Sequence, residues 1–129
     1  MADGGIVAAM DTDHGSTPPA NLLDIVPRYE QGHEADERFE DLLRAPGVRI
    51  ERIVSHGHTT PPDQPYVQDW DEWVLVLEGA AELLLNGTET RKLATGEHLL
   101  IPAGTPHLVT YTASPTIWLA IHLGEARNA

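Results

Sequence analysis

The sequence contains no cysteine. This absence excludes a disulfide framework, a thiolate metal site and a cysteine nucleophile, so any metal ion must be bound through nitrogen and oxygen. Basic residues are also few, with 8 Lys and Arg against 20 Asp and Glu, and the formal net charge is −12. Such a chain repels phosphate backbones and anionic lipids, which argues against nucleic-acid and membrane partners.

Long apolar runs are missing as well. The longest, such as residues 75–77 and 117–121, are far shorter than the roughly 20 residues that cross a bilayer. The first ten residues carry no basic segment and no sustained apolar stretch, so they do not have the pattern of a secretory signal. We therefore expect a cytoplasmic protein with a solvated acidic surface.

The length of 129 residues suits one domain, which buries roughly two-thirds of the surface that its unfolded chain exposes. Residues 1–19 are rich in Gly, Ser, Thr and Pro and have few large side chains. They do not bury enough apolar surface to offset the entropy lost on ordering, which predicts a flexible N-terminal tail. Residues 20–129 then form the single folded domain.

Two elements are expected at the start of this domain. The apolar run from Asn21 to Val26 ends at Pro27 and predicts an edge strand. The segment from Glu34 to Arg44 places apolar residues at helical spacing, with acids early and a base at the end. This pattern predicts one short helix.

From Val48 onward the hydrophobic period is two, as in a β-strand, and His56 and His58 share the parity of the apolar positions. Turn residues divide the rest into further short strands. These are expected at Glu72 to Leu77, Ala81 to Leu85, Thr88 to Leu93, His98 to Ile101, His107 to Thr112 and Thr116 to Leu123. Asn86-Gly87 predicts a tight type I′ hairpin. Many short strands of this kind are typical of an all-β sandwich or barrel.

Two histidines at positions i and i+2 of a strand point to one face, where both can bind the same metal ion. Glu72 stands seven residues before Gly79, and residues 96–107 run from a Gly-Glu pair through Pro-Ala-Gly to His107. These spacings resemble the two motifs of the cupin superfamily, in particular its small single-domain members. The resemblance covers roughly residues 48–123.

The resemblance implies a double-stranded β-helix, the jelly-roll barrel of cupins. It also implies that the first motif supplies two histidines and a glutamate and the second a third histidine. We therefore expect one divalent metal ion, Fe, Mn, Ni, Co or Zn, bound by His56, His58, Glu72 and His107. Ligand type alone does not choose among these metals.

The first motif departs from the family pattern. Residues 59–71 separate His58 from Glu72, where the family usually has three or four residues. An insertion between strands leaves both ligand positions at strand ends and places the inserted residues at the barrel mouth. Asp69 and Asp71 lie in this region as alternative carboxylate ligands, and the distance to Gly79 favours Glu72.

Several other residues are candidates for the pocket. Arg52 shares the parity of the two histidines, so it either pairs with an interior carboxylate such as Glu78 or contacts an anionic substrate. His122 has a core, surface or ligand role. Aromatic side chains with polar tips provide further candidates for pocket walls. These are Tyr66, Trp70 and Tyr111.

Three histidines and one carboxylate leave two positions open on an octahedral ion, which suits an enzyme that binds its substrate or dioxygen directly. By resemblance, we expect a dioxygenase or an isomerase or lyase that acts on a small organic molecule. The alternative is a non-catalytic sensor or small-ligand-binding protein with a structural metal. Small cupins commonly pair, so we also expect a homodimer, with Leu22 to Val26 as one contact.

Overall fold

The computed structural model describes residues 20–25 and 36–124. Within these ranges every regular element is a strand, which confirms the all-β prediction, and no helix is long and apolar enough to cross a membrane. The strands are β1 (Arg38–Ala45), β2 (Val48–Ser55), β3 (Asp71–Glu78), β4 (Ala80–Leu85), β5 (Glu89–Ala94), β6 (His98–Ile101), β7 (His107–Thr112) and β8 (Thr116–Leu123). All six strands predicted after Ser55 are present within one or two residues.

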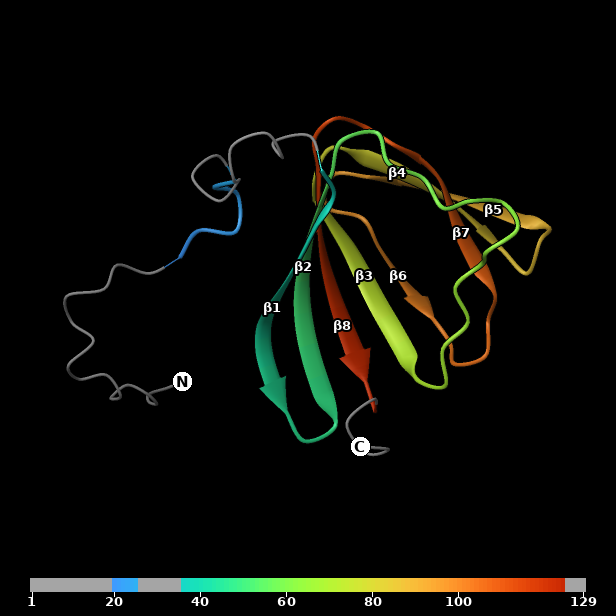
Figure 1. The fold of residues 1–129 in the computed structure, drawn as a ribbon, viewed down its shortest axis with the longest axis horizontal. Coiled ribbons are helices and arrows are strands. Elements are labelled where there is room, and N and C mark those ends of the chain that lie inside the picture. Colours follow the sequence, from blue (N-terminus) through green and yellow to red (C-terminus); the bar gives the residue numbers. More distant parts are fainter. Residues whose placement is uncertain (1–19, 26–35, 125–129) are drawn as a thin grey trace.

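The strands form two antiparallel sheets. One has the order β1-β2-β8-β3-β6 and the other the order β5-β4-β7. Figure 1 shows the larger sheet running across the molecule, with the smaller sheet beyond its β6 side. Neighbours in these orders are often distant in sequence, as expected for the double-stranded β-helix of a cupin barrel, and this fold class is confirmed.

The core lies between the two sheets. Strands β3 and β4 alternate strictly between buried and half-buried side chains over most of their length, so one face of each faces inward. Apolar side chains from both sheets form one cluster there. Its buried members are Val74, Val76, Ala81, Leu83, Leu85, Leu93, Ile101, Trp118 and Ala120.

The helix predicted from Glu34 to Arg44 is wrong, because residues 38–45 form strand β1. Strand β1 pairs antiparallel with β2 through the turn at Pro46-Gly47, and Gly47 has the positive φ of 79° that this turn requires. The pairing register shifts between Asp41 and Leu43, which marks a β-bulge. An extra residue on one strand disturbs the period of two, so apolar side chains fall at a spacing that imitates a helix.

The edge strand predicted from Asn21 to Val26 is also wrong over the described residues. Residues 22 and 23 form a turn instead. The Asn21 side chain accepts a hydrogen bond from the Leu23 N–H at 2.8 Å, and the Asp24 N–H donates to the Asn21 carbonyl at 3.1 Å. An Asn side chain that bonds the backbone two residues on competes with strand pairing. Val26 and the predicted tail, residues 1–19, lie outside the described residues.

The Asn86-Gly87 turn confirms the hairpin prediction, and a second glycine, Gly79, also has a positive φ. Asn86 and Gly87 both have positive φ, 54° and 74°, as a type I′ turn requires, and the Thr88 N–H donates to the Leu85 carbonyl at 3.1 Å. Gly79 has a φ of 96°, and a Cβ there would lie 2.6 Å from the Pro115 carbonyl oxygen. Only glycine fits where β3 passes so close to the turn before β8.

Candidate functional site

A pocket of about 240 Å³ lies inside the barrel, between the two sheets. Its walls combine apolar side chains with polar groups, as small-molecule sites do. The apolar side chains come from strands on both sides: Phe39, Ile53, Val74, Leu83, Ile101, Val109 and Trp118. The polar ones are Glu37, Arg49, Glu51, His58, Thr59, Thr60, Tyr66, Gln68, Glu72, His107 and His122.

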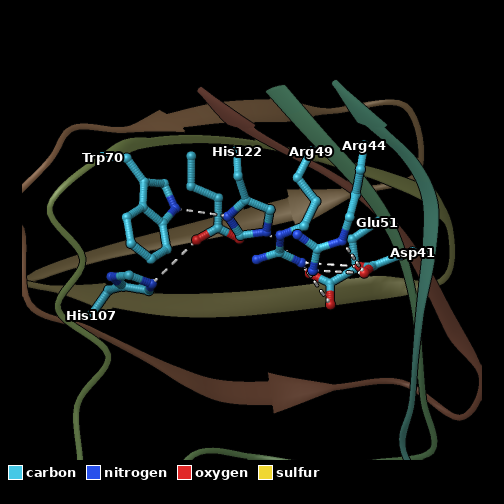
Figure 2. A network of polar contacts seen from close by, with 8 residues as sticks. Asp41, Arg44, Arg49, Glu51, Trp70, His107 and His122 are labelled. Carbon is cyan, nitrogen blue, oxygen red and sulfur yellow. Dashed lines mark hydrogen bonds and ion pairs between the residues drawn. The ribbon is translucent and has the colours of Figure 1, made fainter. Parts of the chain in front are cut away.

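Glu72 and His107 face each other in this pocket. Glu72 comes from β3 of the larger sheet and His107 from β7 of the smaller sheet, and the two residues are only 7% and 5% exposed. His107 Nε2 lies 3.7 Å from Glu72 Oε1 (Figure 2). His107 Nδ1 lies 2.9 Å from the Thr105 carbonyl oxygen, which only accepts hydrogen bonds. Nδ1 therefore carries the proton, and in the neutral ring the Nε2 lone pair faces Glu72.

The two histidines of the first motif lie differently from each other. His58 lines the pocket, whereas His56 does not. His58 Nδ1 accepts a hydrogen bond from the His56 backbone N–H at 2.8 Å, and His56 Nδ1 lies 3.4 Å from the Ser114 hydroxyl. Strand β2 ends at Ser55, and Gly57 has a φ of 82°. The bend at Gly57 breaks the alternation on which the shared parity of the two histidines depended.

The four predicted metal ligands are thus brought together only in part. Glu72 and His107 have the donor types and the tautomer that a divalent ion requires. The neutral His58 ring, by contrast, carries its proton on Nε2, because Nδ1 accepts a hydrogen bond. Over residues 20–25 and 36–124 no three His, Asp or Glu side chains are close enough to hold one ion. The metal ion stays a prediction.

The alternative carboxylates and Tyr111 lie outside the pocket lining. Asp69 is exposed, and Asp71 Oδ1 accepts a hydrogen bond from the Ala103 N–H at 2.8 Å. Tyr111 is 50% exposed and does not line the pocket. Of the carboxylates weighed against each other in the sequence, only Glu72 faces the interior.

Arg52 points away from the pocket, so it forms the structural carboxylate pair that was one of its two predicted roles, but with Glu40 in place of Glu78. Its side chain, 1% exposed, donates from Nε to Glu40 at 2.6 Å and from a terminal nitrogen to the Leu22 and Asp24 carbonyls at 2.8 and 3.0 Å. The suggested partner Glu78 is exposed on β3. Even-numbered residues of β2 face outward, and odd-numbered ones such as Glu51 and Ile53 line the pocket.

The outward position of Arg52 has an electrostatic consequence for Glu40. Burial on its own raises the pKa of the Glu40 carboxyl, but the hydrogen bond and charge of Arg52, together with Arg38, outweigh it. The pKa of Glu40 is therefore lower than usual. This charge pair fastens segment 20–25 to the outer face of the sheet.

Residues 59–70 of the insertion, which we call the strap, run along β7. The Thr60 N–H donates to the Val109 carbonyl at 2.8 Å, and Tyr66 and His107 exchange two backbone hydrogen bonds of 2.9 Å. The Gly104 N–H also donates to the Gln68 carbonyl at 2.7 Å. The strap thereby places Tyr66 and Gln68 at the pocket, with the Tyr66 ring centroid 5.6 Å from that of His107.

His122 anchors the end of the strap. Its Nδ1 accepts a hydrogen bond from Trp70 Nε1 at 2.9 Å, and its Nε2 lies 3.0 Å from Glu51 Oε1 (Figure 2). An indole N–H only donates, so the ring is neutral and its Nε2–H donates to Glu51. Trp70 does not line the pocket itself but fixes His122, which does.

The contacts continue from Glu51 towards the surface. Arg49 lies 3.5 Å from Glu51 and 3.2 Å from Asp41, which also binds Arg44 at 2.9 Å (Figure 2).

Four pocket residues were not predicted from the sequence: Glu37, Arg49, Glu51 and Gln68. The odd parity of β2 was a usable signal for Arg49 and Glu51, but the histidines at even positions pointed to the other face.

Comparisons with known proteins agree with this architecture. A family model described as Cupin domain matches residues 50–122. A solved structure from Ralstonia eutropha JMP134, provisionally named a mannose-6-phosphate isomerase, is 38% identical with a TM-score of 0.72. The match covers 82% of this chain and 97% of that one. No curated protein sequence matches the chain.

Two more distant structures share the fold alone. The DMSP lyase DddQ from Ruegeria pomeroyi DSS-3 is 21% identical, with a TM-score of 0.63, over 79% of this chain and 54% of that one. KdgF from Halomonas sp. is 19% identical, also with a TM-score of 0.63, over 81% of this chain and 95% of that one. At such identities the likeness concerns the barrel and not its chemistry.

Proposed function

This chain belongs to the cupin family, and we propose that it is an enzyme of the isomerase or lyase type that acts on a small organic molecule in the barrel pocket. One observation carries the proposal: the buried carboxylate of Glu72 and the imidazole of His107 face each other, 3.7 Å apart, inside a pocket that also has apolar walls. Convergent polar groups in an apolar cavity are the usual mark of a reaction site. The name of the 38% identical relative supports an isomerase over an oxygenase.

The chemistry assigned to the pair is proton transfer. Glu72 Oε1 and His107 Nε2 both hold lone pairs, so a single proton shared between them makes one group an acid while the other is a base. The base removes a proton from a carbon next to a carbonyl or carboxyl group. The acid then returns a proton to the substrate, or a leaving group departs with its electron pair.

A metal ion is compatible with this pair but is not used in the steps above. Two donors fit a divalent ion, which would supply Lewis acidity at the same place. No third donor joins them within the described part of the chain. The activity of the protein should therefore be compared without metal and after loading with Fe(II), Mn(II), Ni(II), Co(II) or Zn(II).

Hydrogen exchange with solvent tests this proposal even while the substrate is unidentified. A panel of small carbonyl compounds is incubated with the protein in D₂O, with and without each metal ion, and deuterium incorporation at carbon is followed by ¹H NMR. We expect incorporation that falls by roughly 10²- to 10⁴-fold in Glu72→Gln and His107→Ala. Glu89→Gln, on the exposed part of β5, is the matched control with an unchanged rate.

Two results would contradict the proposed proton-transfer function. An absence of exchange with every compound and metal, or exchange that persists in both variants, overturns the proposal. Oxygen consumption with the same panel would instead indicate a dioxygenase, which is the other enzyme class expected from the sequence.

The homodimer expected from the sequence stays a prediction, and small-angle solution scattering would test it.

A further inference from the structure

Three carboxylates from three segments of the chain line the pocket. Glu37 precedes β1, Glu51 lies on β2 and Glu72 lies on β3. Among the described lining residues only one guanidinium, that of Arg49, stands against these three carboxylates, and the His122 ring is neutral because its Nδ1 accepts the Trp70 N–H. The lining therefore carries an excess of negative charge.

Arg49 already forms ion pairs with protein carboxylates. Its guanidinium lies 3.2 Å from Asp41 and 3.5 Å from Glu51, and only Glu51 of these two lines the pocket. The guanidinium of Arg52 is on the other face of the sheet. Among the described residues, the one arginine that lines the pocket already has carboxylate partners, so an anionic ligand would find little positive charge there.

Glu72 is the least compensated of the three carboxylates. It is 7% exposed and faces the imidazole of His107, not a guanidinium or ammonium group. The nearest basic atom is His107 Nε2 at 3.7 Å, beyond hydrogen-bond distance. A carboxylate that is mostly buried beside no cationic side chain is costly, and a ligand that brings positive charge offsets this cost.

The remaining walls suit the same kind of ligand. Phe39, Tyr66 and Trp118 line the pocket, and aromatic faces attract cations through the ring quadrupole. The pKa of the Tyr66 hydroxyl is raised, first by burial and then by the charges of Glu37, Glu72 and Glu51. One phenol at the pocket thus senses all three carboxylates.

We propose that the pocket takes a small organic cation, a protonated amine or a quaternary ammonium group, between its carboxylates and its aromatic walls. The inference rests on the proposed function, because the ligand occupies the same pocket. It also predicts a ligand different from the phosphorylated sugar in the name of the 38% identical relative. A phosphate group in this pocket would be repelled by the three carboxylates.

Three probes of the same shape and different charge test the proposal on the unmodified protein. They are choline, its neutral isostere 3,3-dimethylbutan-1-ol and the anion 3,3-dimethylbutanoate. Affinities are measured by titration calorimetry, and NMR signals of Trp118 and Tyr66 report binding inside the pocket. We expect choline to bind at least roughly tenfold more tightly than the alcohol and the anion not to bind.

Variants locate the charge that matters. Glu37→Gln and Glu51→Gln should each weaken choline binding by roughly three- to tenfold and leave the affinity for the alcohol unchanged. Glu89→Gln, outside the pocket, should change neither affinity. Added salt should weaken binding of choline alone.

The results that overturn the inference differ from those that overturn the proposed function. Equal binding of choline and the alcohol, tighter binding of the anion, or binding of none of the three removes the cation class, even if deuterium exchange is observed. Binding of choline with no deuterium exchange in any substrate removes the enzyme and keeps the cation class.

Discussion

The two faces of strand β2 each carry one arginine held by carboxylates, yet the two arginines have different surroundings. On the outer face, Arg52 is 1% exposed and is enclosed by Glu40 and two backbone carbonyls. On the inner face, Arg49 is 14% exposed and its contacts lead through Glu51 to His122 and the pocket. The contacts of Arg52 hold segment 20–25 on the outer face, whereas the contacts of Arg49 continue into the pocket.

The comparison teaches that a buried arginine is not by itself a sign of a substrate site. What distinguishes the two faces is whether the carboxylate partner has further neighbours that line a cavity. Glu40 does not line the pocket, whereas Glu51 does. Matched Glu→Gln substitutions on the two faces therefore separate stability from function.

The largest effect is expected for Glu40→Gln. This substitution leaves the guanidinium of Arg52 buried without its counter-charge, and breaking a buried pair in this way costs about 3–5 kcal/mol. Denaturant unfolding measures the loss, and Glu89→Gln, in the exposed pair with Arg91, should change stability by less than about 1 kcal/mol. A loss for Glu40→Gln as small as that of the control would contradict the structural role of the outer pair.

Acid should remove the same contribution without a substitution. The folded-state pKa of Glu40 lies below the usual value of 4.5, so its stabilisation is complete above the unfolded pKa and is lost as the pH falls through the folded one. The unfolding free energy measured from neutral pH to about pH 3 should therefore fall more steeply in the wild type than in Glu40→Gln. Parallel curves would show that Glu40 is not linked to acid stability.

Glu51→Gln should cost less, about 1 kcal/mol, although it removes the same charge. The glutamine carbonyl still accepts the His122 Nε2–H, and Arg49 keeps its contact with Asp41. The same unfolding experiment compares the two faces directly. A loss equal to that of Glu40→Gln would mean that the inner network is as important for stability as the outer pair.

The smallest effect is expected for Trp70→Phe, about 0.5 kcal/mol, because water can replace the indole N–H at this half-buried position. A sharper readout is the His122 tautomer. Long-range ¹H–¹⁵N spectra of the wild type should show a neutral ring with its proton on Nε2. A proton on Nδ1 would rule out the hydrogen bond from Trp70 and with it the anchoring of the strap.

The barrel could be predicted from the sequence because its signals are local. Asn86-Gly87 gave a turn of known geometry, and the strands that follow Ser55 alternate cleanly. Strand β1 could not, since its bulge between Asp41 and Leu43 gives the apolar residues a helical spacing. That bulge depends on pairing with β2, which no local pattern shows.

The candidate site was predictable to a similar extent. Glu72 and His107 line the pocket because the motif spacing placed them on β3 and β7, and their role as metal ligands stays a prediction. His58, Tyr66 and His122 line it as well. His56 and Arg52 were placed by extending one parity along β2 and beyond it. The bend at Gly57 and the outward direction of the even positions depend on the pairing of β2 with β8, so alternation alone misplaced both residues.

The way in which the strap is attached has a practical consequence for engineering. Most of its contacts with the barrel are backbone hydrogen bonds, at Thr60, Tyr66 and Gln68, and these do not depend on the identity of the side chains. The side chains of Tyr66 and Gln68, which face the cavity, are therefore open to replacement while the main chain stays in place. A library randomised at these two positions would alter ligand selectivity on an unchanged scaffold.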